Sequence, residues 1–397
     1  MENSGIIQTG SDSPLNPFIS EPEKRRTLRA LSQMSVGLQV EDTPVPGAKC
    51  LSISPSGMFI HTDYPIPVGA SGSVTLRETI ESRCYAFGAD FTVVRREERS
   101  SRGPGIGVSF LQISEDNQKA LKEIVEYQRS LMAREKLVIA EEKMIGFQCK
   151  IARSTEELEA ACRIVHDSYV QAGYMDPQPS GLRLTLHHAL PKTTIFLVTR
   201  DEQFIATSTL FPDSPLGLPM DSLYREELNR LRLSGRILGE VGSLAVHREF
   251  REPNPTLPLF IHKMIYRYAL ENLKMDDTVL TINPRHQLYY QHVMLCEKIG
   301  EEKSYQTVNG NPAIALRNDL ATLKPRFEVF YDGFPPEKNM HGFYCREHKD
   351  IIQLPPEGEA ISLWNGDLVR YYFEKVTDVF ARADQKSVQY IKGLYGL

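Results

Sequence analysis

An acidic residue at the start of an apolar run and two tyrosines in a later helical segment are candidates for acid–base chemistry in this sequence. Glu240 opens the run EVGSLAVH at 240–247, and Tyr289 and Tyr290 lie in QLYYQH at 287–292. A carboxylate can take a proton from a nucleophile, and a tyrosine hydroxyl can donate one to a leaving group. The alternative interpretations are an acid held in a salt bridge and tyrosines that pack in the core.

A second group of residues near the N-terminus has the chemistry of an anion site. Arg25 and Arg29 lie four residues apart, and Ser52, Ser54 and Gly57 follow in SISPSG. Guanidinium groups make forked hydrogen bonds to phosphates and stack on bases. Hydroxyl groups and a glycine turn supply short donors and let the backbone approach a ligand.

The first third of the chain must supply strands to position this second group. Short apolar runs alternate with turn residues over 24–110, which predicts a small antiparallel barrel or sandwich. Apolar residues at three- and four-residue steps predict a helix over 115–142, which connects the two halves of the chain.

The remaining chain alternates between helical and strand patterns. Ser154 or Thr155 is the expected N-cap of a helix over 155–172, and a hairpin is expected from two apolar runs that flank Asp201 and Glu202. Further helices are predicted near 223–233, 259–273, 287–299 and 368–383, with strands at 241–246 and 278–282.

The arginine and serine pattern resembles the PilZ domain, whose motifs are RxxxR and [DN]xSxxG. The resemblance covers about 20–128 and implies a receptor for cyclic di-GMP, with Arg25 and Arg29 on the phosphates and guanine and with Ser54 and Gly57 in the second motif. Ser52 departs from the family, because a hydroxyl replaces only part of the hydrogen bonding of Asp or Asn. The alternative is a PilZ barrel that serves as an adaptor without nucleotide.

The order of elements around Glu240 resembles the GNAT N-acyltransferase fold, whose fourth strand reads E-x-x-x-L-A-V. In that family the fourth and fifth strands splay apart and admit the pantetheine arm of the donor, and backbone N–H groups polarise the thioester. The loop that usually cradles the coenzyme A pyrophosphate is rich in glycine. Residues 248–258 contain no glycine and three prolines, which lack N–H donors. The expected donor is therefore the acyl-phosphopantetheine of an acyl-carrier protein.

Segments at 169–175, 283–286 and 305–313 look like the bacterial N-acyl amino acid synthases. This resemblance spans about 147–320 and implies a long-chain acyl donor on a carrier protein and an amino acid acceptor. In that reaction Glu240 is the candidate base, directly or through water, and Tyr290, with Tyr289 as substitute, is the candidate acid. Substrate-binding candidates are Tyr174, Arg183 and Asn283.

Carrier proteins are acidic, so their docking surface needs local basic charge. The sequence offers six candidates near the glycine-free loop: Arg230, Arg232, Arg248, Arg251, Lys263 and Arg267. The alternative for each is a solvated surface position.

Composition limits the other possibilities. The net charge of -5 over 397 residues gives no general attraction to nucleic acid. Six scattered cysteines and the histidine spacing predict neither disulfides nor a metal site, and no cofactor is expected to be tightly bound. We expect no signal peptide and no transmembrane segment, hence a cytoplasmic protein that contacts membrane at most transiently for product release.

These observations predict an α+β multidomain fold, in which a small antiparallel β-barrel precedes a GNAT-like mixed α/β domain with a helical and loop-containing C-terminal extension. The expected boundaries are a disordered leader at 1–20, the barrel at 21–128, a connecting helix at 129–145, the acyltransferase domain at 146–320 and the extension at 321–397. Two other functions stay open: an inactive cyclic di-GMP receptor, and an acyl-homoserine-lactone-type synthase.

Overall fold

The computed structural model describes residues 30–80, 83–98, 104–251 and 255–397. The described chain divides between Lys136 and Leu137 into an N-terminal and a C-terminal unit. Arg25, Arg29 and the predicted leader at 1–20 lie outside the described residues.

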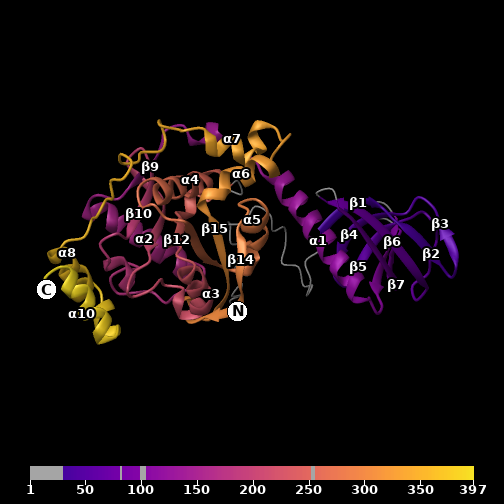
Figure 1. Ribbon diagram of the computed structural model, residues 1–397, viewed down its shortest axis with the longest axis horizontal. Helices are drawn as coiled ribbons and strands as arrows, with labels where there is room; N and C mark the ends of the chain where they lie inside the picture. The colour runs from indigo at the N-terminus through magenta and orange to yellow at the C-terminus, as the bar shows by residue number, and fades with distance from the viewer. Residues whose placement is uncertain (1–29, 81–82, 99–103, 252–254) are drawn as a thin grey trace, which may run out of the picture. The chain divides into compact units, whose positions relative to one another are not determined.

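The N-terminal unit is one antiparallel sheet with a helix packed against it (Figure 1). The strands follow the order β1-β4-β5-β8-β7-β6-β2-β3 across the sheet. Their bounds are β1 Ala30–Ser35, β2 Gly37–Val40, β3 Thr43–Val45, β4 Lys49–Ser54, β5 Gly57–His61, β6 Ser71–Ile80, β7 Arg83–Glu97 and β8 Gly105–Phe110.

Alternating residues of these strands form one core. Ile53, Met58 and Ile60 are 0% exposed and point to one face, as the two-residue period of a strand requires. Helix α1, Glu115–Lys136, covers that core with residues that include Ile124 and Val125. This arrangement confirms the predicted antiparallel unit.

The connection between the units differs from its prediction. The helix begins at Glu115 as expected but ends at Lys136, and only the 3₁₀ helix η1, Glu141–Met144, follows before the next strand. The predicted connecting helix at 129–145 is therefore helical only in part.

The C-terminal unit is built on a seven-stranded mixed sheet with the order β14-β15-β13-β12-β11-β10-β9. Among the strands of the described residues, β12 and β13 are the one pair that runs parallel. The strand bounds are β9 Phe147–Ile151, β10 Thr194–Arg200, β11 Gln203–Pro212, β12 Leu238–Val246, β13 Asp277–Ile282, β14 Glu297–Tyr305 and β15 Asn311–Asp319.

Helices α2, Thr155–Gln171, and α4, Thr256–Glu271, cover opposite faces of this sheet. On β10, Phe196 packs against Tyr268 of α4, and the next residue, Leu197, belongs to the core cluster that includes residues of α2. Neighbouring residues of a strand point to opposite faces, so the two helices sandwich the sheet. Ser154 caps α2 with its side chain and forms the predicted N-cap.

The remaining helices of the C-terminal unit are short. They are α3 Asp221–Leu233, α5 Gln287–His292, α6 Leu320–Phe330, α7 Met340–Cys345, α8 Gly366–Arg370, α9 Val379–Arg382 and α10 Gln385–Leu394, with the π-helix η7 at Tyr371–Val376 and 3₁₀ helices η2 Leu186–Ala189, η3 Arg248–Phe250, η4 Pro284–His286, η5 Gln306–Val308 and η6 Pro336–Lys338. The helix predicted at 287–299 is wrong beyond His292, because strand β14 starts at Glu297.

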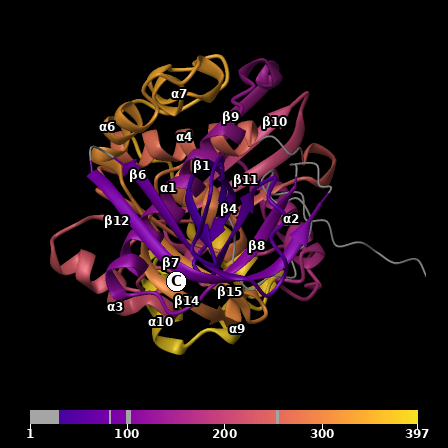
Figure 2. The ribbon, with the colours of Figure 1, turned by 90° about the vertical axis from the view of Figure 1, so that its right-hand side faces the viewer.

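The C-terminal residues complete the core of this unit. Trp364, Tyr372 and Phe373 are buried in the same cluster as Leu158 and Ala161 of α2. Figures 1 and 2 show the last helices of the chain, among them α10, together in yellow, apart from α6 and α7 in orange. The extension is therefore part of the fold of this unit.

Candidate active site

Strands β12 and β13 form a fork. They pair only from Leu238 to Glu240 on β12 and from Asp277 to Val279 on β13. On the other side of β12 the register with β11 shifts, and Ser243 there has a φ of 53°. A bulge of this kind bends a strand, so β12 turns away from β13 just beyond Glu240. The splay that the resemblance implied is present.

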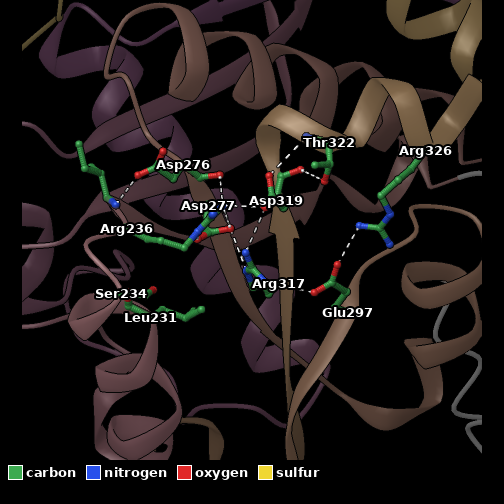
Figure 3. Close-up of polar contacts among 11 residues, drawn as sticks. Leu231, Ser234, Arg236, Asp276, Asp277, Glu297, Arg317, Asp319, Thr322 and Arg326 are labelled. Atoms are coloured by element: carbon green, nitrogen blue, oxygen red, sulfur yellow. Dashed lines mark hydrogen bonds and ion pairs between the residues drawn. The ribbon is translucent and has the colours of Figure 1, made fainter.

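A buried charge network holds the closed end of the fork (Figure 3). The carboxylate of Asp277 is 0% exposed and accepts hydrogen bonds from Arg236 and from Arg317 of β15, the latter at 2.8 Å. Arg236 also reaches Asp319 at 2.8 Å, and Arg317 reaches Glu297 of β14 at 3.2 Å. These contacts tie the start of β13 to its neighbouring segments.

A cavity of about 740 Å³ lies at the open end of the fork. The diverging halves of both strands line it, together with the C-terminal part of α2, the start of α4, α5 and the hairpin between β14 and β15. Its apolar residues include Leu244, Leu257 and Ile282. Its size lies in the upper part of the range of about 300–1,000 Å³ that is common for ligand pockets.

Glu240 lies where the fork opens and lines the cavity. Its side chain is 4% exposed, and Oε2 accepts a hydrogen bond of 2.7 Å from the N–H of Met220. Burial raises the pKa of Glu240 to about 8, because the charged form loses its hydration. No ion pair holds Glu240 within the described part of the chain, so the salt-bridge alternative is not supported.

Tyr290 and Tyr289 both line the same cavity. The hydroxyl of Tyr290 lies 3.3 Å from Nε2 of His262 on α4. Burial keeps the pKa of Tyr290 well above its usual range, so the hydroxyl remains protonated. Burial also lowers the pKa of His262 to about 4, so the imidazole is neutral near pH 7. Tyr289 is more deeply buried, and its ring packs edge-to-face on Tyr290.

The three predicted substrate-binding residues also line the cavity. Tyr174 accepts a hydrogen bond of 2.6 Å from Arg285, and Asn283 accepts one of 3.1 Å from the N–H of Arg285. The guanidinium of Arg183 lies 4.5 Å from the ring centre of Tyr169. Among the ion pairs of the described residues, none engages Arg183, so its charge can serve an anionic ligand.

The predicted docking residues differ in exposure and in their partners. Arg230 and Arg248 are exposed, and Arg251 lines the cavity while it bonds Ser168 and the carbonyl of Val246. Arg267 is half-buried beside Glu271.

Two predicted docking residues are occupied inside the fold. Arg232 forms short ion pairs with Asp213 and Asp221, each at 2.6 Å. Lys263 is 0% exposed and donates to the carbonyl of Phe343 at 2.6 Å. The burial of Lys263 contradicts its assignment to a docking surface, whereas Arg232 is partly exposed and its charge is compensated by the two carboxylates.

The described part of the nucleotide motif lies on β4 and β5. Ser52 and Ser54 are buried, and the hydroxyl of Ser54 donates to the carbonyl of Gly57 at 3.0 Å. A Cβ on Gly57 would lie 2.3 Å from the carbonyl oxygen of Val108, so only glycine lets β5 approach β8 here.

Sequence reasoning missed His262, Tyr305, Arg285 and Tyr169 as cavity residues. Tyr305 packs near Glu240, whose charge adds to burial in raising the pKa of the phenol. Tyr169 and Tyr305 stand in segments that carried the family resemblance, which was a usable signal. His262 lies on α4, far in sequence from Tyr290, and nothing in its local pattern marks it.

Two absences complete the description of the site. The described residues contain no group of three or more His, Cys, Asp or Glu side chains that could hold a metal ion. None of the helices among them has both the length and the apolar character needed to cross a bilayer.

Comparisons with known families give one match in each half of the chain. Residues 160–319 match the family described as N-acyl amino acid synthase FeeM, and residues 23–127 match the PilZ domain, as the resemblances predicted. No curated protein matches the chain.

Several solved structures are similar to parts of this chain. FeeM, an N-acyl amino acid synthase from uncultured soil microbes, shows 29% identity over 45% of this chain and 94% of its own, with a TM-score of 0.41. The acyl-homoserine-lactone synthase LasI shows 15% identity over 44% and 90%, with a TM-score of 0.34. The PilZ domain of YcgR from Escherichia coli, solved with c-di-GMP, shows 17% identity over 29% and 97%, with a TM-score of 0.24.

Proposed function

We propose that this chain, in which a PilZ domain precedes a domain that matches the N-acyl amino acid synthases, transfers a long-chain fatty acyl group from acyl-carrier protein to the amine of an amino acid. The observation that carries the proposal is the buried carboxyl of Glu240 at the opening of the β12–β13 fork, inside a cavity of about 740 Å³. A base next to the space for a thioester is what amide formation requires.

The reaction uses the two acid–base groups in sequence. Glu240 takes a proton from the ammonium group of the acceptor, and the neutral nitrogen attacks the thioester carbonyl. A C–N bond forms, the C–S bond breaks, and Tyr290 protonates the leaving thiolate. The nitrogen loses its second proton as the amide forms, so one proton ends on the thiol sulfur and one passes to water.

The charges of the cavity suit an α-amino acid as acceptor. A carboxylate bound to Arg183 in a forked arrangement would hold the molecule by one end. Arg183 and Glu240 both line the cavity, and the charge of each acts on the pKa of the Tyr305 phenol, which lines it too. The acceptor would therefore present its amine to Glu240 while its carboxylate stays on Arg183.

The donor is proposed to be a carrier protein because of the segment before α4. Pro255 precedes the first helical residue, Pro258 lies in the first turn, and both lack N–H groups. Arg251 in the cavity wall and the exposed Arg248, three residues earlier, remain as local positive charge. One phosphate of a phosphopantetheine arm needs fewer donors than a pyrophosphate.

Cyclic di-GMP is proposed to regulate the transfer through the chain that joins the units. Directly after α1, the N–H of Ala140 donates to Thr256 at the start of α4, at 2.9 Å. Residues 142–145 then line the cavity. A displacement of α1 would therefore be transmitted to the cavity wall, because no long flexible linker separates the two.

The test is mass spectrometry of products from purified protein with an acylated carrier protein and a mixture of amino acids. N-acyl amino acids are expected, with much lower turnover from acyl-coenzyme A of the same chain length. Efficient turnover with acetyl-coenzyme A alone would contradict the carrier-protein assignment, and acyl-homoserine lactone from S-adenosylmethionine would favour the alternative synthase.

A further inference from the structure

Four residues form a row across the outer face of the N-terminal sheet. Ser52 of β4 pairs with Phe59 of β5, Phe59 pairs with Gly107 of β8, and Gly107 pairs with Arg95 of β7. Cross-strand partners share a face of a sheet. Their neighbours Ile53, Met58 and Val108 belong to the core, so this row lies on the opposite face.

Arg95 extends over Gly107 to the ring of Phe59. A Cβ on Gly107 would lie 2.6 Å from Cγ and 2.7 Å from Nε of Arg95, so the arginine side chain runs over the space that glycine leaves. Its guanidinium carbon lies 5.2 Å from the centre of the Phe59 ring. The guanidinium therefore stands above the residue that faces Ser52 on the next strand.

The environment of Arg95 leaves it available to a ligand. Its side chain is 39% exposed, and its ion-pair partner is Glu97, two residues along the same strand, at 3.0 Å. A partly exposed pair of this kind contributes little free energy, so a ligand can replace it at small cost. The ring of Phe59, only 5% exposed, supports the guanidinium from below.

We propose that Arg95 is a third arginine of the nucleotide site and that a guanine base of cyclic di-GMP stacks on its guanidinium. This inference rests on the proposed nucleotide function of the N-terminal unit. Planar guanidinium groups stack on aromatic faces and bind bases in a way that an ammonium group does not. The additional contact would offset the weaker hydrogen bonding of Ser52, which stands where the motif has Asp or Asn.

The experiment is titration of the full chain with cyclic di-GMP by calorimetry, comparing Arg95→Ala with Arg96→Ala. Arg96 is the adjacent exposed arginine, pairs with Glu98 at 3.4 Å, and its loss changes the net charge equally. We expect Arg95→Ala to raise Kd about tenfold or more and Arg96→Ala to leave it within about twofold. Thermal unfolding of both variants checks that the fold is intact.

Two further variants test the geometry. Gly107→Ala should displace the Arg95 side chain and weaken binding, and the double variant with Arg95→Ala should be no weaker than Arg95→Ala alone. Arg95→Lys keeps the charge but not the planar group, so it should not restore affinity; full restoration would overturn the stacking contact.

The outcomes separate this inference from the function on which it rests. If the unaltered chain does not bind cyclic di-GMP, the nucleotide function fails and the inference fails with it. If the chain binds and Arg25→Ala abolishes binding, but Arg95→Ala has the same Kd as Arg96→Ala, only the role of Arg95 is overturned.

Discussion

Burial changes the chemistry of individual residues in the cavity. Glu240 has its pKa raised to about 8 by desolvation, which brings the carboxyl close to the range in which amines titrate. A base whose pKa is near the working pH combines a useful ionised fraction with sufficient basicity. The same burial keeps Tyr290 protonated and His262 neutral, so the phenol is available as proton donor while the carboxyl of Glu240 ionises as the pH approaches 8.

Replacement of Glu240 by glutamine is expected to lower kcat/KM by about 10²–10⁴-fold, because the amide cannot accept the proton. In the unaltered chain kcat/KM should rise with pH up to about 8, as Glu240 ionises. The variant should not show this rise. Initial rates from pH 6 to 9.5 measure this. An unchanged rate would show that another group is the base.

The same substitution should have a pH-dependent effect on stability. The folded carboxyl binds its proton more tightly than the unfolded one, whose pKa is near 4.5, so its contribution to stability is complete below 4.5 and is lost as the pH rises through 8. Glu240→Gln should therefore gain in Tm relative to the unaltered chain between pH 5 and 9. Equal pH dependence of the two Tm curves would mean that Glu240 titrates normally.

Tyr290→Phe should reduce kcat by about 10²-fold with little change in KM, since the hydroxyl acts only on the leaving group. Tyr289→Phe is the matched control, because it removes a hydroxyl from the adjacent and more deeply buried ring. Steady-state kinetics with the same donor compare them. A larger decrease in kcat for Tyr289→Phe than for Tyr290→Phe would mean that Tyr289 is the acid.

At the scale of elements, the fork needs one closed end and one open end. The bulge at Ser243 opens it, and the network around Asp277 closes it. A buried carboxylate is tolerated in a fold when it is paired with cations, as Asp277 is with two arginines. If the carboxylate is removed, the arginine charges lose their partner, and the fold is destabilised.

Asp277→Asn is accordingly expected to destabilise the fold by about 3–5 kcal/mol. Glu297→Gln is the control, since this carboxylate is 45% exposed where it pairs with Arg317 and Arg326, and its loss should cost about 1 kcal/mol or less. Chemical denaturation of both variants measures the difference. Equal values would show that Asp277 does not anchor the strands.

At the scale of the whole molecule, the proposed regulation by cyclic di-GMP depends on the segment after α1. Glu141 forms an ion pair with Arg346 and a hydrogen bond of 3.1 Å with Nε2 of His348, and Nδ1 of His348 lies 2.6 Å from the ammonium of the buried Lys263 of α4. The beginning of the C-terminal unit is therefore attached to the helix that borders the cavity and to the C-terminal segment.

Glu141→Gln is expected to weaken this attachment and to reduce the effect of cyclic di-GMP on turnover at least severalfold while nucleotide affinity stays unchanged. Glu347→Gln, an exposed carboxylate paired with Lys349, is the control. Turnover with and without nucleotide, beside calorimetric Kd values, separates coupling from binding. An unaltered response in Glu141→Gln would locate the coupling elsewhere.

The order of strands and helices was accessible from the sequence, because hydrophobic period and capping residues such as Ser154 are local properties. That Glu240 and Tyr290 belong together in one region could also be predicted, through short segments that resemble known families, and both line the cavity. The helix predicted beyond His292 was wrong because the residues that follow pair as β14 with β15, and such pairing depends on distant residues.

Only the tertiary structure decided which charged residues are free to act. Arg232 and Lys263 look like surface cations in the sequence, yet the first is paired with Asp213 and Asp221 and the second is buried in α4. His262 and Arg95 gained their significance from neighbours on other elements. The local sequence determines the hydrophobic period and the secondary-structure propensity of a segment. The burial of a side chain and its ion-pair partners depend on contacts between residues far apart in the chain. Burial and ion pairing in turn set the pKa values and the free charges on which catalysis and binding depend.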